Sequence, residues 1–174
     1  PLLGRPDTGV ILRSGSQGDL LRALDALALD VVLTNLAPAR DAASPYLVHA
    51  LAEQPVSLVG QPDRRALVGA PLHKALAAAP LVLPSADSAL RAGFDALIAR
   101  LGVSVQIAAE ADDMAMLRLL ARAGAGLAVL PPVVVRDELA SGRLVELARL
   151  GDLSERFFAV TRARRFPNPL LDTV

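Results

Sequence analysis

The chain has 174 residues, of which 53% are hydrophobic and only 3% aromatic, and its 18 basic and 18 acidic residues give a formal net charge of zero. This length accommodates one domain or two small lobes, and the balanced charge argues against a module that wraps nucleic acid by itself. The sequence has no cysteine, which excludes disulfides and thiolate metal sites and suits a cytoplasmic protein. No apolar run reaches the roughly 18 residues that a membrane span needs.

Short β-branched runs alternate with longer Ala- and Leu-rich stretches along the chain. This alternation is the pattern of βαβ units and predicts a largely parallel sheet covered by helices. Turn and cap residues from Ser14 to Asp19 begin the first predicted helix. In the first half of the chain we predict strands at 9–13, 30–35 and 56–60 and helices at 20–29 and 72–78.

The second half continues the same alternation. Gly102 occupies the position of a left-handed C-cap, and Asp112 or Asp113 provides the N-cap of the helix that begins at Met114. Pro131 and the next proline suit the first turn of a short helix. Here we predict strands at 81–84, 103–109, 127–130, 144–147 and 156–161 and helices at 89–101, 114–123 and 131–139.

Polar residues follow three of the predicted strands where the chain turns into a helix or loop. Thr34 and Asn35 end one strand, Ser85 to Ser88 follow another, and Asp112 follows a third. In open α/β sheets ligands bind beyond the carboxyl ends of parallel strands, where helix N-termini direct N–H groups outward. The turn at Ser85 to Ser88 therefore suits a carboxylate or another small anion.

Each of these candidates has a purely structural alternative. Ser85 and Ser88 are preferred N-cap residues, and Thr34 and Asn35 are typical of a turn at a strand end. The carboxylates at 112 and 113 suit an N-cap and the helix dipole better than a bound cation. His49 and His73 are too far apart in the sequence for a metal site or a general-base pair, and no Gly-x-Ser-x-Gly elbow or nucleotide-binding loop occurs. We therefore expect no metal, no cofactor and no catalysis.

Several segments, in this order, resemble the sensing domain of LysR-type bacterial transcriptional regulators. Residues 29–33 resemble that family's "LD-apolar-apolar" strand, residues 123–131 resemble its "aGxGiaxLP" segment, and residues 141–145 resemble its "dGrLv" turn. Residues 55–59 and 157–162 lie where the family has its two hinge-crossing strands. Residues 109–117 also resemble the branch that activates sodium/proton antiporter synthesis.

The resemblance implies an α/β fold of the two-lobed, periplasmic-binding-protein-like type II, with two hinge-crossing strands. Lobe I would comprise residues 1–58 and 161–174 and be incomplete at both ends, and lobe II would comprise residues 59–160. A small-molecule or ion effector would bind in the cleft between the lobes. Its expected contacts are Thr34, Asn35, Ser85, Ser88 and Asp112.

The same resemblance implies a cytoplasmic homodimer, or a homotetramer at full length, that contacts DNA only through an N-terminal winged helix-turn-helix absent from this sequence. Two other classes of protein remain open on the residues alone. One is a periplasmic-type solute-binding receptor of similar fold. The other is an enzyme on a two-lobed scaffold, which needs a catalytic carboxylate, lysine or covalent cofactor; Lys74, on a short predicted helix, is a poor candidate.

Overall fold

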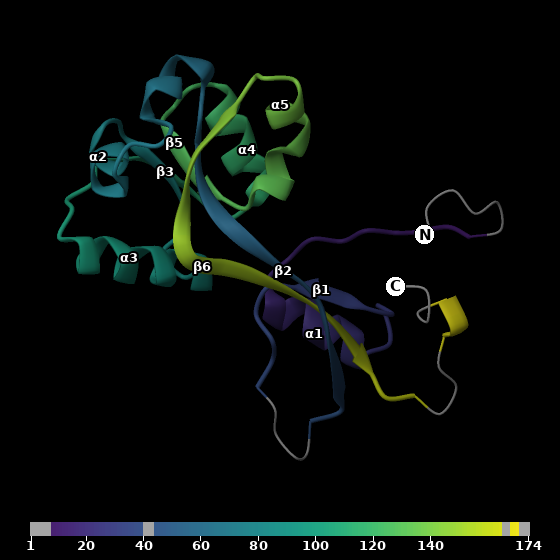
Figure 1. Cartoon of the computed structure of the whole chain (residues 1–174). Coiled ribbons are helices and arrows are strands. Elements are labelled where there is room, and N and C mark those ends of the chain that lie inside the picture. The colour runs from purple at the N-terminus through teal and green to yellow at the C-terminus, as the bar shows by residue number, and fades with distance from the viewer. Residues whose placement is uncertain (1–7, 40–43, 165–167, 171–174) are drawn as a thin grey trace. The chain divides into compact units, whose positions relative to one another are not determined.

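The computed structural model describes residues 8–39, 44–164 and 168–170, and the chain divides into two compact units (Figure 1). Unit 1 comprises residues 1–52 and 156–174, and unit 2 comprises residues 53–155. Two long strands, β2 (Tyr46–Gly60) and β6 (Val145–Arg162), contribute residues to both units. The predicted functional lobes, with limits at 58/59 and 160/161, stay a prediction, and part of lobe I lies outside the described residues.

Unit 2 is built on a mixed sheet. Strand β3 (Leu81–Pro84) pairs in parallel with β4 (Ile107–Ala111) and β5 (Leu127–Leu130), whereas β5 pairs antiparallel with β2. Over the described parts of the chain the strand order is β1-β6-β2-β5-β3-β4, where β1 is Val32–Thr34. The predicted largely parallel sheet is therefore wrong, because β1 with β6 and β2 with β5 pair antiparallel, and the parallel pairs are those of β3 with β4 and β5.

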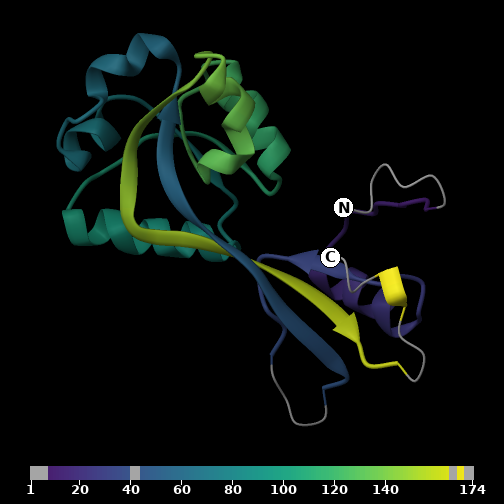
Figure 2. The same cartoon turned by 45° about the vertical axis from the view of Figure 1, so that its right-hand side comes forward.

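Helices cover both faces of the unit 2 sheet. Helices α2 and α3 cover one face and α4 and α5 cover the other (Figure 1 and Figure 2). Alternate strand residues point to opposite faces, so Leu81 and Leu83 pack with α2 and α3, whereas Val82 packs with α4 and α5. Phe94 of α3 is fully buried in the first of these two cores. The helical elements are η1 (Pro62–Leu67), α2 (Leu72–Ala77), α3 (Ala89–Leu101), α4 (Met114–Arg122), η2 (Pro132–Val135) and α5 (Arg136–Ala140).

Unit 1 contains helix α1 (Gln17–Asp25) and the short strand β1 (Val32–Thr34), which pairs antiparallel with β6. The Ser16 hydroxyl caps α1 by accepting a hydrogen bond from the Asp19 N–H at 3.2 Å. A small core of apolar side chains joins the helix to the strands. Its fully or nearly buried members are Leu24, Val32 and Val160.

Several predicted elements differ from the structure. No strand forms at 9–13, where the Ile11 and Leu12 side chains are 83% and 84% exposed. The first helix ends at Asp25, since Leu27 adopts a left-handed conformation with φ of 60°. The strand predicted at 103–109 lies at 107–111, and those at 144–147 and 156–161 are parts of one strand, β6. Within the described residues no helix has both the length and the hydropathy to traverse a bilayer.

Candidate functional site

The carboxyl ends of β3 and β4 lie next to each other in unit 2. The two strands are in register as far as Pro84 and Ala111, and the Ser85 N–H donates to the Ala111 carbonyl at 2.9 Å. Asp112 follows directly after β4. The structure thus brings Ser85 and Asp112 to one edge of the sheet, which we call the carboxyl edge (Ser85, Ser88 and Asp112).

The serines of the carboxyl edge also hold the start of helix α3. The Ser88 hydroxyl accepts a hydrogen bond from the Arg91 N–H at 3.1 Å and is the N-cap, and the Ser85 hydroxyl donates to the Asp87 carboxylate at 2.7 Å. The Ser88 N–H donates to the Ser85 carbonyl at 3.1 Å and closes the turn. Ser88 therefore has the N-cap role that the sequence analysis gave as its structural alternative. A ligand would bind to a turn that hydrogen bonds already order.

Beneath this turn lies Arg91, a residue that the sequence analysis missed. Its guanidinium is only 11% exposed and donates to the Pro84 carbonyl at 3.2 Å, to the Asp95 carboxylate at 2.9 Å and to the Glu110 carboxylate. The hydrogen bond that Arg91 donates to the Glu110 carboxylate is the main cause that raises the pKa of Arg91, and burial opposes this shift. The Arg91–Asp95 spacing of four residues on a predicted helix was the available signal.

The buried guanidinium of Arg91, a residue of α3, connects this helix to β3 and β4 through its hydrogen bonds to Pro84 and Glu110. Because it is paired with Asp95 and Glu110, its charge does not by itself make the edge positive. The edge offers hydroxyls and a helix N-terminus as donors and carboxylates as acceptors. This arrangement can hold a small polar ligand.

The two acidic residues after β4 have different roles. The Asp113 carboxylate accepts a hydrogen bond from the Ala115 N–H at 2.9 Å and is the N-cap of α4, whereas Asp112 is exposed beside it. In the part of the chain that the structure describes, no cluster of three or more His, Cys, Asp or Glu side chains could hold a metal ion. A bound cation at this position therefore gains no support.

Thr34 and Asn35 belong to unit 1, at the end of β1. The Thr34 hydroxyl accepts from the Leu36 N–H at 3.1 Å and from the Gln17 side-chain amide at 3.4 Å. These bonds form the turn at the strand end that the sequence left open as the structural alternative. Asn35 follows in the same turn and is exposed.

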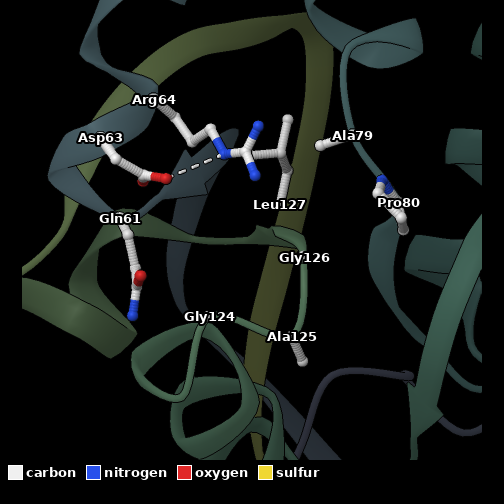
Figure 3. A pocket seen from close by; sticks show the side chains of 9 residues that line it. All are labelled: Gln61, Asp63, Arg64, Ala79, Pro80, Gly124, Ala125, Gly126 and Leu127. Atoms are coloured by element: carbon white, nitrogen blue, oxygen red, sulfur yellow. Dashed lines mark ion pairs between the residues drawn. The ribbon is translucent and has the colours of Figure 1, made fainter.

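A pocket in unit 2 lies at the other end of β3. Pro80, just before β3, and Gly126, just before β5, line it together with residues that follow β2 (Figure 3). We call it the amino-edge pocket. None of the five predicted contacts lines it; its residues are Gln61, Asp63, Arg64, Ala79, Pro80, Gly124, Ala125, Gly126 and Leu127.

Comparison with family models decides the class of the protein. The model of the LysR substrate binding domain matches residues 4–174, which is nearly the entire chain. The chain belongs to the LysR substrate-binding domain family. The predicted family and the type II periplasmic-binding-protein-like fold are thus confirmed, and the protein is an effector-sensing domain of the LysR class. The narrower likeness to sodium/proton antiporter regulators stays a prediction.

Solved structures similar to this LysR domain have the same fold at low identity. The apo regulatory domain of HypT from Salmonella typhimurium gives a TM-score of 0.71 at 20% identity, over 97% of this chain and 80% of that one. The LysR-family regulator CbnR gives 0.70 at 18%, over 91% and 54%. DarR of Vibrio fischeri, solved with DNA, gives 0.68 at 21%, over 92% and 54%.

The chain therefore spans about half the length of the CbnR and DarR chains. Comparison with curated protein sequences finds no significant match. What distinguishes this LysR domain from others of its family must accordingly be argued from its own residues.

Proposed function

We propose that this domain senses a small-molecule or ion effector and thereby modulates DNA binding by an N-terminal winged helix-turn-helix in the intact regulator. The family match over residues 4–174 carries the proposal. The effector contacts we propose are Ser85, Ser88 and Asp112 of the carboxyl edge in unit 2 and Thr34 and Asn35 in unit 1.

The geometry of the carboxyl edge supports this assignment. Hydrogen bonds already hold the turn from Ser85 to Ser88, so a ligand would not have to order it. Helix α3 begins at this turn and directs its first N–H groups and the positive end of its dipole toward the edge. Arg91 links the start of this turn to β4, because its guanidinium donates to both the Pro84 carbonyl and the Glu110 carboxylate. These features favour an effector with a carboxylate or another polar oxygen.

The proposal can be tested by calorimetry after an effector has been found. Small anions and sodium salts are screened by thermal shift, and the best ligand is titrated into the wild type, Ser85→Ala and Ser88→Ala. Loss of a hydroxyl that contacts the ligand should cost about 1–3 kcal/mol in binding. Unfolding of each variant is measured separately, because Ser88 is also a cap.

Ser141→Ala is the matched control. Its hydroxyl donates to the Asp137 carbonyl at 2.7 Å at the end of α5 and does not belong to the carboxyl edge. We expect this variant to bind the effector like the wild type. Unchanged affinity in both Ser85→Ala and Ser88→Ala would refute the site.

The remaining features of the proposal concern the intact protein. We propose a cytoplasmic homodimer, a homotetramer at full length, that needs no cofactor and is not an enzyme. The pairing of Arg91 with two carboxylates supports a binding role over catalysis. The Arg91 guanidinium is held in place by these pairs and stays charged, so it does not transfer protons. The alternative of a periplasmic-type solute receptor is not favoured by the family match.

A further inference from the structure

Hydrogen bonds and close contacts hold part of the wall of the amino-edge pocket. Its volume is about 70 Å³. The Gln61 side chain forms part of one wall and donates from Nε2 to the Arg122 carbonyl at 2.9 Å. Gly124, at φ of 74°, lies so close that a Cβ there would come within 2.9 Å of the Gln61 amide. Any side chain at 124 would therefore displace Gln61 and change the pocket.

A second wall is the backbone between α4 and β5. The Leu127 N–H donates to the Pro80 carbonyl at 2.9 Å, which ties the starts of β3 and β5 together. A Cβ at Gly126 would come within 2.4 Å of the same carbonyl oxygen, so the approach requires glycine. The two glycines thus keep the pocket open and its backbone in place.

Arg64 provides the positive charge of the pocket. Its Nε lies 3.4 Å from the Asp63 carboxylate, and both side chains are substantially exposed, at 46% and 63%. Such an exposed pair contributes little and is easily exchanged for another carboxylate. In Figure 3 the Asp63 carboxylate lies on the Nε side of the Arg64 guanidinium, and the two terminal nitrogens lie on the side away from that carboxylate. The fork that binds carboxylates bidentately is therefore turned away from Asp63.

Two features nearby oppose an anion: the Asp63 carboxylate and the C-terminal end of α4. The negative partial charge at that helix end comes from carbonyl groups without intrahelical partners. The last four carbonyls of α4 all accept hydrogen bonds, and this reduces the repulsion between the helix end and a bound anion. The donors are the N–H groups of Ala123, Ala125 and Gly124 and, for Arg122, the Gln61 side chain.

We propose that the amino-edge pocket is a second ligand site, which binds a small monocarboxylate of acetate size through Arg64. A cavity of about 150 Å³ accommodates benzene, so a volume of about half that size fits a ligand of roughly four heavy atoms. The carboxylate pairs with the guanidinium fork, and the methyl group packs against Leu127 and Pro80. This site is separate from the carboxyl edge, since the two lie at opposite ends of β3.

The test is a calorimetric titration of the domain with sodium acetate, with sodium chloride at equal ionic strength as the blank. Arg64→Gln should weaken acetate binding by roughly two- to fivefold, as the loss of a partly exposed ion pair implies. Arg65→Gln is the matched control, because Arg65 is an exposed neighbour on η1 outside the pocket. Asp63→Asn removes the competing carboxylate and should tighten binding, which keeps the test decisive if Arg64→Gln folds poorly.

Several results would overturn this second site. They are the absence of saturable acetate binding, equal losses in Arg64→Gln and Arg65→Gln, and binding of methylammonium in place of acetate. Ser85→Ala and Ser88→Ala separate the two sites. If these variants lose acetate while Arg64→Gln keeps it, acetate binds at the carboxyl edge and only the second site is refuted.

Discussion

At the scale of single residues, the N-cap of α3 has a measurable consequence. Ser88→Ala removes the hydroxyl that accepts the Arg91 N–H, and we expect a loss of about 1 kcal/mol in the free energy of unfolding. Ser85→Ala should cost less, because its hydroxyl bonds only to the neighbouring Asp87 at an exposed position. Urea denaturation of the two variants measures the difference. Equal losses would show that Ser88 is not the cap in solution.

The buried Glu138 predicts a pH dependence of stability. Its side chain is 4% exposed and one carboxylate oxygen lies 2.8 Å from Nη2 of Arg118. The hydrogen bond from Arg118 lowers the pKa of Glu138, burial opposes this shift, and Arg122 adds to it at a distance of 3.7 Å. Because the folded state holds the pKa below its unfolded value, this contribution to stability is present above the ordinary glutamate pKa. It is lost as the pH falls through the lowered pKa.

The comparison is between wild type and Glu138→Gln, with urea midpoints measured from neutral pH down to below the glutamate range. The wild type should lose more stability on acidification than the variant, which keeps the shape of the side chain but cannot titrate. Arg136→Gln is a suitable control, since Arg136 is 81% exposed and pairs only weakly, at 3.9 Å, with Asp137. Parallel pH profiles of wild type and Glu138→Gln would contradict this role.

At the scale of elements, alanine substitutions at two glycines distinguish the cost of close packing from the cost of backbone strain. Gly126→Ala places a methyl group 2.4 Å from the Pro80 carbonyl, between β3 and β5, and should cost about 1–3 kcal/mol. Gly102→Ala meets no atom within 4 Å but has φ of 62°, so it should cost only about 1 kcal/mol. Denaturant unfolding of both variants measures these losses. A Gly126→Ala variant as stable as the wild type would show that β3 and β5 do not approach this closely.

Helix α3 shows what the sequence can predict. Its range, 89–101, is confirmed, because the signals at both ends are local: the Ser88 hydroxyl bonds within the first turn, and Gly102 adopts the left-handed C-cap. The same holds for β3 and β5. The sequence also predicts Ser85 and Asp112 at one sheet edge, since both follow strands that run parallel.

Elements that depend on distant partners were predicted less well. The strand after Gly102 begins late, because the Val103 N–H still bonds back to the Ile98 carbonyl and keeps the first residues out of the sheet. The continuous apolar run from Val10 to Leu12 favoured a strand at 9–13 that does not form in the structure. Arg91 was missed because its partners Pro84 and Glu110 become neighbours only when β3 and β4 pair.

At the scale of the whole molecule, this domain should not bind DNA by itself. Its formal net charge is zero, and duplex DNA attracts proteins mainly through neutralised phosphates. We expect an anisotropy titration with a labelled duplex at physiological salt to give no more binding than a neutral control protein. Sub-micromolar binding that weakens with added salt would contradict the assignment of DNA binding to another part of the regulator.

The most direct test of the sensing role is amide hydrogen exchange with and without an effector found by the thermal-shift screen. Effector binding at the carboxyl edge should slow exchange at the amides of Ser85, Ser88 and Asp112, because a ligand there shields and stabilises the start of α3. The amides from Gly124 to Leu127, at the other end of the sheet, should exchange at unchanged rates. Protection confined to the Gly124–Leu127 turn, or unchanged exchange at Ser85, Ser88 and Asp112, would contradict the proposed effector site.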